Sequence, residues 1–83
     1  MQQTIYVVQA FERRQAQIVP AWQEPATNSA SARRRACRAA EQKAGAAAIE
    51  LIVDEETGVI NSARIIDCYG AVPDDLDATC GGM

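Results

Sequence analysis

Residues 4–11 read TIYVVQAF, and this run decides how the rest of the chain can be arranged. It is rich in β-branched and aromatic side chains, which favours a β-strand. Alternation along a strand divides the apolar side chains between two faces: Ile5, Val7 and Phe11 on one, and Tyr6, Val8 and Ala10 on the other. Because both faces are apolar, the run predicts a strand in the interior of a sheet.

Residues 16–22 predict a second strand, joined to the first by a polar hairpin connection at residues 12–15. Pro20 has no N–H to donate to a neighbouring strand, so this run is expected to be short and to lie at an edge of the sheet. Pro25 then indicates a loop over residues 24–28.

Residues 30–44 consist mainly of strong helix formers, and Asn28, Ser29 and Ser31 are candidate caps for the start of a helix. Gly45 is expected to follow the last turn as its C′ residue. The side chains of one helical face are small: Ala32, Ala36, Ala40 and Ala44, joined by Cys37 and Ala39. Such a helix buries little apolar area but can lie close to a sheet.

Two further strands are predicted over residues 47–54 and 59–69, connected by a turn in which Gly58 supplies a positive φ. The apolar residues of the third strand share one face: Ile49, Leu51 and Val53. Those of the fourth are expected to alternate, with Ala63, Ile65 and Tyr69 on one face and Ile66 and Cys68 on the other.

The order hairpin, helix, hairpin predicts an α+β domain of ββαββ order. If the helix returns the chain across the sheet, the first strand lies between the second and the third, which gives an antiparallel sheet of order 2-1-3-4. One helix then covers one face only. We expect a single domain over residues 1–73, followed by an acidic, flexible tail over residues 74–83.

The composition predicts a thin core and a need for a second cover. Hydrophobic residues make up 48% of the 83 residues, but 16 of them are alanine. A sheet that is apolar on both faces, with one small-residue helix, is therefore expected to form a homodimer through its open face or an edge strand. The candidate contact residues are Tyr6, Val8, Ile52 and Ile66. The alternative is that the carboxyl-terminal segment folds back over the open face.

Charge is distributed unevenly along the chain. Residues 1–45 hold seven basic and three acidic side chains, whereas residues 46–83 hold one basic and eight acidic. Arg33, Arg34, Arg35 and Arg38 concentrate on the predicted helix, which suggests binding of an anion, of nucleic acid or of an acidic protein partner. The alternative is a solvated helix face. Nucleic acid is disfavoured by the net charge of −3 and the pI of about 4.7.

Catalysis is not predicted, because the chain has no histidine and none of its cysteines or serines has a base in a recognisable motif. The acidic clusters at residues 54–56 and 74–77 do not match a calcium loop, and no cysteine pair has the spacing of a zinc site, so neither a metal nor a cofactor is expected. We expect the thiols to be free, with Cys37 and Cys68 as small buried side chains. Together with the lack of a signal peptide or membrane segment, this predicts a cytoplasmic protein.

Four stretches resemble a group of small uncharacterised bacterial proteins of about this length: YVVQAFE at residues 6–12, the alanine- and arginine-rich middle helix, DEETG at residues 54–58 and YGAVPD at residues 69–74. The resemblance implies no activity, cofactor or site residue. The sequence therefore favours a small interaction or accessory protein that self-associates, and anion or nucleic-acid binding through the helix is the alternative.

Overall fold

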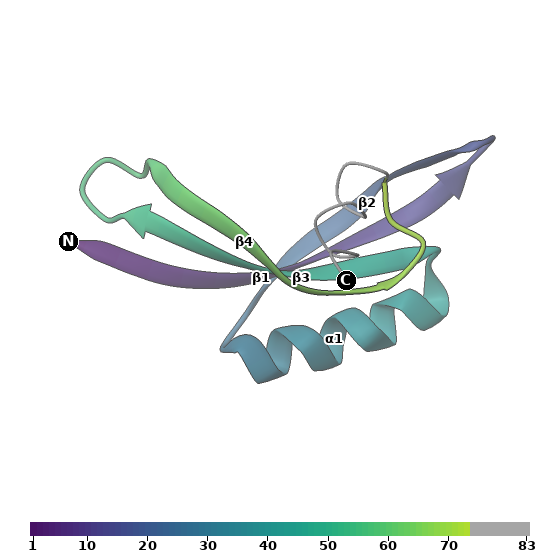
Figure 1. Ribbon diagram of the computed structural model, residues 1–83, viewed down its shortest axis with the longest axis horizontal. Coiled ribbons are helices and arrows are strands. Elements are labelled where there is room, and N and C mark those ends of the chain that lie inside the picture. The colour runs from purple at the N-terminus through teal and green to yellow at the C-terminus, as the bar shows by residue number, and fades with distance from the viewer. Residues whose placement is uncertain (74–83) are drawn as a thin grey trace.

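The computed structural model describes residues 1–73 and consists of one antiparallel sheet with one helix against it (Figure 1). The elements are β1 (Gln2–Arg14), β2 (Gln17–Ala26), α1 (Ser29–Gln42), β3 (Gly45–Asp54) and β4 (Ile60–Gly70). The strand order is β2-β1-β3-β4, and each neighbouring pair is antiparallel. The predicted ββαββ order, sheet order and single helix are thereby confirmed. The predicted tail at residues 74–83 lies outside the described residues.

β2 is longer than predicted, because it continues through Pro25 to Ala26 and includes the residues expected to form a loop. Its position at the edge explains this, since alternate N–H groups of an edge strand face solvent and a proline there removes no ladder hydrogen bond. The hairpin connection is correspondingly tighter than the one expected at residues 12–15. It consists of Gln15 and Ala16, and Gln15 has a φ of 56°.

α1 begins at an Asn28 cap, whose side-chain oxygen accepts a hydrogen bond from the Ser31 amide at 2.8 Å. The helix ends at Gln42 with Lys43 as its C-cap, so the expected role of Gly45 as C′ residue is wrong. Gly45 instead begins β3 and is buried against the backbone of Ala71. The turn between β3 and β4 is as predicted, and Gly58 in it has a φ of 76°.

The core between α1 and the sheet is built from small side chains. Seven residues form it: Val8 and Ala10 of β1, Ala32, Ala36 and Ala39 of α1, and Ala46 and Ala48 of β3. Val8 is the largest side chain that is fully buried. Cys37, predicted to be buried in the helix stripe, is exposed. The buried face of α1 runs through Ala32, Ala36 and Ala39, and Cys37 lies to one side of that line.

A β-bulge in β4 changes which face its side chains occupy. The register with β3 shifts between Ala48 and Ile49, so that Ile65 lies opposite Ile49 but Asp67 lies opposite Ala48. Ile66 and Tyr69 consequently pack on the helix-side core, whereas Cys68 packs with Phe11 and Ala47 on the other side. The predicted alternation, with Tyr69 beside Ile65 and Ile66 beside Cys68, is wrong for this reason.

The sheet extends beyond the helix at one end. There the first half of β1, the end of β3 and the start of β4 project past the start of α1 (Figure 1). We call this part, residues 2–6, 50–54 and 60–64, the arm. From Gln2 to Ile5 the β1 strand pairs with β3 only, since its pairing with β2 begins at Tyr6. Apart from Tyr6, which packs against the core beneath α1, the arm lies beyond the helix on both faces (Figure 1).

Candidate functional site

The face of the sheet opposite α1 carries a block of aliphatic side chains in register across three strands. One row aligns Val7, Ile49 and Ile65, the next aligns Ile5, Leu51 and Ala63, and the last aligns Gln3, Val53 and Ile60. Eight of these nine positions are aliphatic. We call these eight residues the aliphatic array: Ile5, Val7, Ile49, Leu51, Val53, Ile60, Ala63 and Ile65.

The other face of the arm is mainly polar. Its rows contain Thr4 opposite Ile52 and Ile52 opposite Ser62, followed by Glu50 opposite Arg64. The Arg64 and Glu50 side chains form an ion pair with an N–O distance of 3.3 Å. The arm is therefore an amphipathic sheet. Such a sheet normally has its apolar face packed against a core and its polar face in water.

The aliphatic array is incompletely covered by residues 1–73. Val7 is buried and five other side chains of the array are half-buried, whereas Ala63 is exposed and Ile60 keeps 56% of its surface exposed. Strands lie about 4.8 Å apart and same-face residues about 6.7 Å apart along a strand, so the array has a flat footprint of about 300 Å². The exposed apolar area is smaller than this footprint, because Val7 is buried and most of the other side chains are half-buried. The largest contiguous apolar patches on monomers are often functional.

The opposite end of the same face is covered by the segment that follows β4. Val72 is buried with Phe11 and Ala47, and Ile18, Ile49 and Cys68 pack against this cluster. The Ala71 amide donates to the Ala44 carbonyl at 2.9 Å and holds the segment in place. The start of the carboxyl-terminal segment thus folds over part of the open face, but the cluster it forms lies beyond the arm.

None of the four residues predicted for self-association belongs to the aliphatic array. Val8 is fully buried beneath α1, and Tyr6 and Ile66 pack against the same core. Ile52 lies on the polar side of the arm, between Thr4 and Ser62. Val8 is thereby excluded as a surface contact, because the helix covers the face of β1 that carries Tyr6 and Val8. A role of Ile52 in self-association stays a prediction. The sequence signal for the aliphatic array was the alternation of Ile49, Leu51 and Val53.

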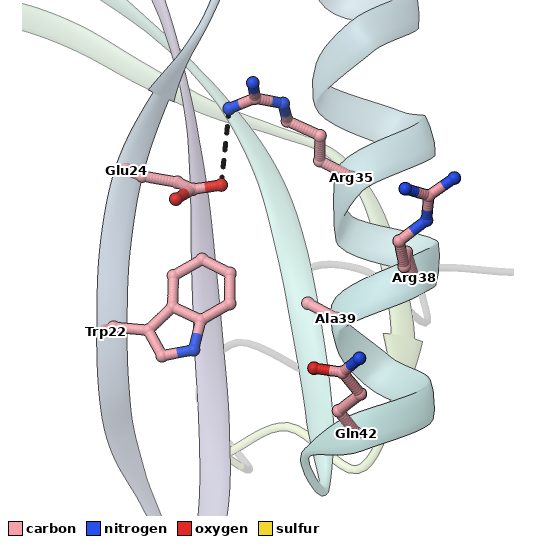
Figure 2. A pocket seen from close by; sticks show the side chains of 6 residues that line it. All are labelled: Trp22, Glu24, Arg35, Arg38, Ala39 and Gln42. Atoms are coloured by element: carbon pink, nitrogen blue, oxygen red, sulfur yellow. Dashed lines mark hydrogen bonds and ion pairs between the residues drawn. The ribbon is translucent and has the colours of Figure 1, made fainter.

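Arg35 is tied to the sheet and differs in this from the other helix arginines. Its Nη1 lies 3.3 Å from a carboxylate oxygen of Glu24 and donates to the Pro25 carbonyl at 3.1 Å. Figure 2 shows Arg35 pointing from α1 towards Glu24 on β2, above the ring of Trp22, whereas the Arg38 guanidinium turns away from that strand. These side chains line a groove of about 290 Å³ between α1 and β2, together with Ala39, Gln42 and Trp22, which has 36% of its surface exposed.

Arg33, Arg34 and Arg38 gather instead in a groove of about 360 Å³ that also includes Tyr69 of β4. Cys37 and Glu41 complete its lining. Burial, the nearby Asp67 carboxylate and a hydrogen bond from the Tyr69 hydroxyl to Asp67 at 3.2 Å raise the pKa of Tyr69, and the charge of Arg33 acts in the opposite direction. The structure therefore brings three of the four predicted arginines together in this groove. Arg35 does not line it, and shares the first groove with Arg38 only.

The two cysteines of the described part have different states. Cys37 is a free, exposed thiol, whereas Cys68 is disulfide-bonded. The prediction of free thiols is wrong at Cys68, and the argument for a cytoplasmic location that rested on it no longer holds. Among residues 1–73 no group of three or more His, Cys, Asp or Glu side chains could hold a metal ion.

In the same part of the chain, no helix has the length and apolar character that a membrane span requires.

Comparison with known proteins gives no relative. The chain matches no protein-family model, no curated protein and no solved structure at a significant level. The resemblance to small bacterial proteins remains a prediction, and the function has to be argued from the aliphatic array and the arginine-lined groove themselves.

Proposed function

We propose that this protein is a small non-catalytic interaction protein that self-associates as a homodimer through the aliphatic array. The observation that carries the proposal is the amphipathic arm, which has aliphatic side chains in register on one face and Thr4, Ser62 and the Glu50–Arg64 pair on the other. An apolar sheet face of this kind is stable in water only when something packs on it. The chain also lacks histidine, the commonest general base, which supports a non-catalytic role.

A second copy fits the array better than the rest of the chain does. The ten residues after Pro73 read DDLDATCGGM and include three aspartates, which would have to be desolvated to cover an aliphatic surface. Their large apolar side chains are limited to Leu76 and Met83. A second array is uncharged and of the same extent, and two sheets can pack face to face about 10 Å apart with interdigitated aliphatic side chains.

Face packing also fits better than pairing between edge strands. The β2 edge carries Pro20 and Pro25, which interrupt its row of hydrogen-bond donors. The outer edge of β4 has no strand partner among residues 1–73, but pairing there would leave the array exposed. Because a standard interface buries about 800 Å² per partner, the array of about 300 Å² would form its apolar centre, and surrounding residues would form the rim.

The proposal is tested by placing a lysine on either face of β3. Leu51 lies in the array, and its neighbour Ile52 is equally half-buried but points to the polar side of the arm. We expect the native chain to have about twice its 8.9 kDa mass in light scattering at high micromolar concentration. Leu51→Lys should return it to the monomer mass, and the matched control Ile52→Lys should remain dimeric.

Ala63→Lys serves as a second disruptive variant, since Ala63 is already exposed and its replacement does not disturb the monomer core. Circular dichroism would verify that each variant is folded. A native chain that is monomeric at high micromolar concentration would refute the proposal. So would dissociation by Ile52→Lys while Leu51→Lys and Ala63→Lys stay dimeric, because the interface would then use the helix side of the arm.

A further inference from the structure

The groove between α1 and β4 is lined by arginines that form no ion pair with any other residue of the described chain. We call it the arginine groove, and its lining residues are Arg33, Arg34, Cys37, Arg38, Glu41 and Tyr69. Three guanidinium groups face a single carboxylate in this lining. The groove lies on the helix side of the sheet, so it is separate from the aliphatic array.

The ion pairs of residues 1–73 all lie elsewhere. Arg14 pairs with Glu12, Arg35 with Glu24 and Arg64 with Glu50. The first pair lies within β1, the second joins α1 to β2 and the third joins β3 to β4. In the described part of the chain, the guanidinium groups of the arginine groove have no carboxylate within ion-pair distance. Their donors are therefore available to a ligand.

The three arginines are spaced so that their side chains reach one groove. They lie at the fifth, sixth and tenth positions of α1, beyond its first turn. Arg34 and Arg38 are one helical turn apart, which puts their Cβ atoms about 5–6 Å from each other on the same side of the helix. Arg33 adds a third guanidinium next to Arg34.

The chemistry of this donor set matches a phosphate group. Each guanidinium presents a planar fork of N–H donors, and phosphate oxygens can accept two parallel hydrogen bonds from one fork. A phosphate group has more negative charge and more acceptor oxygens than a carboxylate, so it can bind more guanidinium groups at once. Tyr69 provides a partly buried aromatic wall between the helix and Asp67.

We propose that the arginine groove binds a phosphate group, held by Arg33, Arg34 and Arg38. The phosphate could be carried by a small phosphorylated molecule or by the backbone of a single-stranded nucleic acid. Arg35 is not part of the site, because its guanidinium is bound by Glu24 and the Pro25 carbonyl on the other side of the helix.

Cys37 provides a readout within the groove, since its free thiol is exposed among the arginines. The test is the rate of Cys37 alkylation by neutral iodoacetamide, followed by peptide mass spectrometry, with and without pyrophosphate at an ionic strength matched by KCl. We expect saturating pyrophosphate to slow the alkylation at least threefold. A single-stranded oligonucleotide in a parallel arm identifies the source of the phosphate: protection at lower concentration than pyrophosphate assigns a nucleic-acid backbone.

Two variants with matched charge changes separate the site from general electrostatics. Arg38→Gln removes a groove guanidinium and should abolish most of the protection, whereas Arg35→Gln removes the same charge from the same helix and should retain it. The ratio of alkylation rates with and without pyrophosphate is compared within each variant, because each substitution also changes the charge around Cys37. Glutamine preserves helix propensity in both.

Three results would overturn the proposal. One is the absence of protection by both pyrophosphate and the oligonucleotide at millimolar concentration. Another is an equal loss of protection in Arg35→Gln and Arg38→Gln, which would show attraction to the overall charge of the helix. The third is equal protection by a hexaglutamate peptide at matched ionic strength, because the groove would then bind carboxylates as well as phosphate.

Discussion

Replacement of Gly45 by alanine should be one of the most destabilising single changes in the chain. A Cβ added at Gly45 would lie 2.0 Å from the carbonyl oxygen of Ala71 and 2.7 Å from its carbonyl carbon and amide nitrogen. These are backbone atoms, so no side-chain rotation can relieve the overlap. The start of β3 and the segment after β4 would have to separate by more than 1 Å to restore an ordinary van der Waals contact.

The magnitude follows from what this separation breaks. The hydrogen bond from the Ala71 amide to the Ala44 carbonyl, now 2.9 Å long, would be lost, at a cost of about 0.5–1.5 kcal/mol. Val72, which is 8% exposed, would lift from Phe11 and Ala47, and exposing a valine costs about 1.5–3 kcal/mol. We therefore expect Gly45→Ala to lower the free energy of unfolding by about 2–4.5 kcal/mol, which is much of the stability of a small domain.

Urea unfolding followed by circular dichroism measures this change, and Gly58→Ala is the matched control. A Cβ at Gly58 would meet nothing within 4 Å, so its cost comes only from the φ of 76° and should be about 1 kcal/mol. Amide hydrogen exchange at Ala71 should lose protection in Gly45→Ala but not in Gly58→Ala. The reasoning is refuted if Gly45→Ala unfolds within about 0.5 kcal/mol of the native chain, or is less destabilising than Gly58→Ala.

Two further predictions concern the helix cap and the tyrosine of β4. Asn28→Ala removes the acceptor of the Ser31 amide and should lower the free energy of unfolding by about 1 kcal/mol in the same urea assay, whereas Asn28→Ser should restore most of it. The pKa of Tyr69 is raised from its usual 10.0 mainly by burial and by Asp67. The folded state therefore favours the neutral phenol, and this contribution to the free energy of unfolding is present below pH 10 and is lost as the pH rises above it. Tyr69→Phe should make unfolding less sensitive to pH in this alkaline range, and an unchanged slope would contradict the assignment.

The strand order could be predicted because it depends on a few local signals. The apolar faces of residues 4–11 require an interior strand, Pro20 requires an edge, and one helix between two hairpins leaves a single simple antiparallel order. The structure has this order. The side-chain assignment in β4 could not be predicted, because the bulge at Ile66 depends on pairing with β3 and has no glycine or proline to mark it.

The sites were harder to predict than the fold, because they depend on which face the helix covers. Both faces of β1 are apolar, so its sequence does not say whether Val7 or Val8 lies beneath α1. The structure decides this by packing the alanines of α1 on Val8 and Ala48. The separation of Arg35 from Arg34 also required the structure, since adjacent helix residues point in different directions and only Arg35 reaches Glu24 on β2.

The size of the core side chains links the two parts of the sheet. Alanines on both sides of the interface between α1 and the sheet allow the helix to lie close to β1 and β3. The close approach leaves little space for large apolar side chains beneath the helix. The chain's larger aliphatic side chains accordingly concentrate on the opposite face, and most of those in the arm lie in the aliphatic array. If a second copy covers this array, as we propose, a substantial share of the hydrophobic stabilisation comes from association, and the stability of the fold depends on protein concentration.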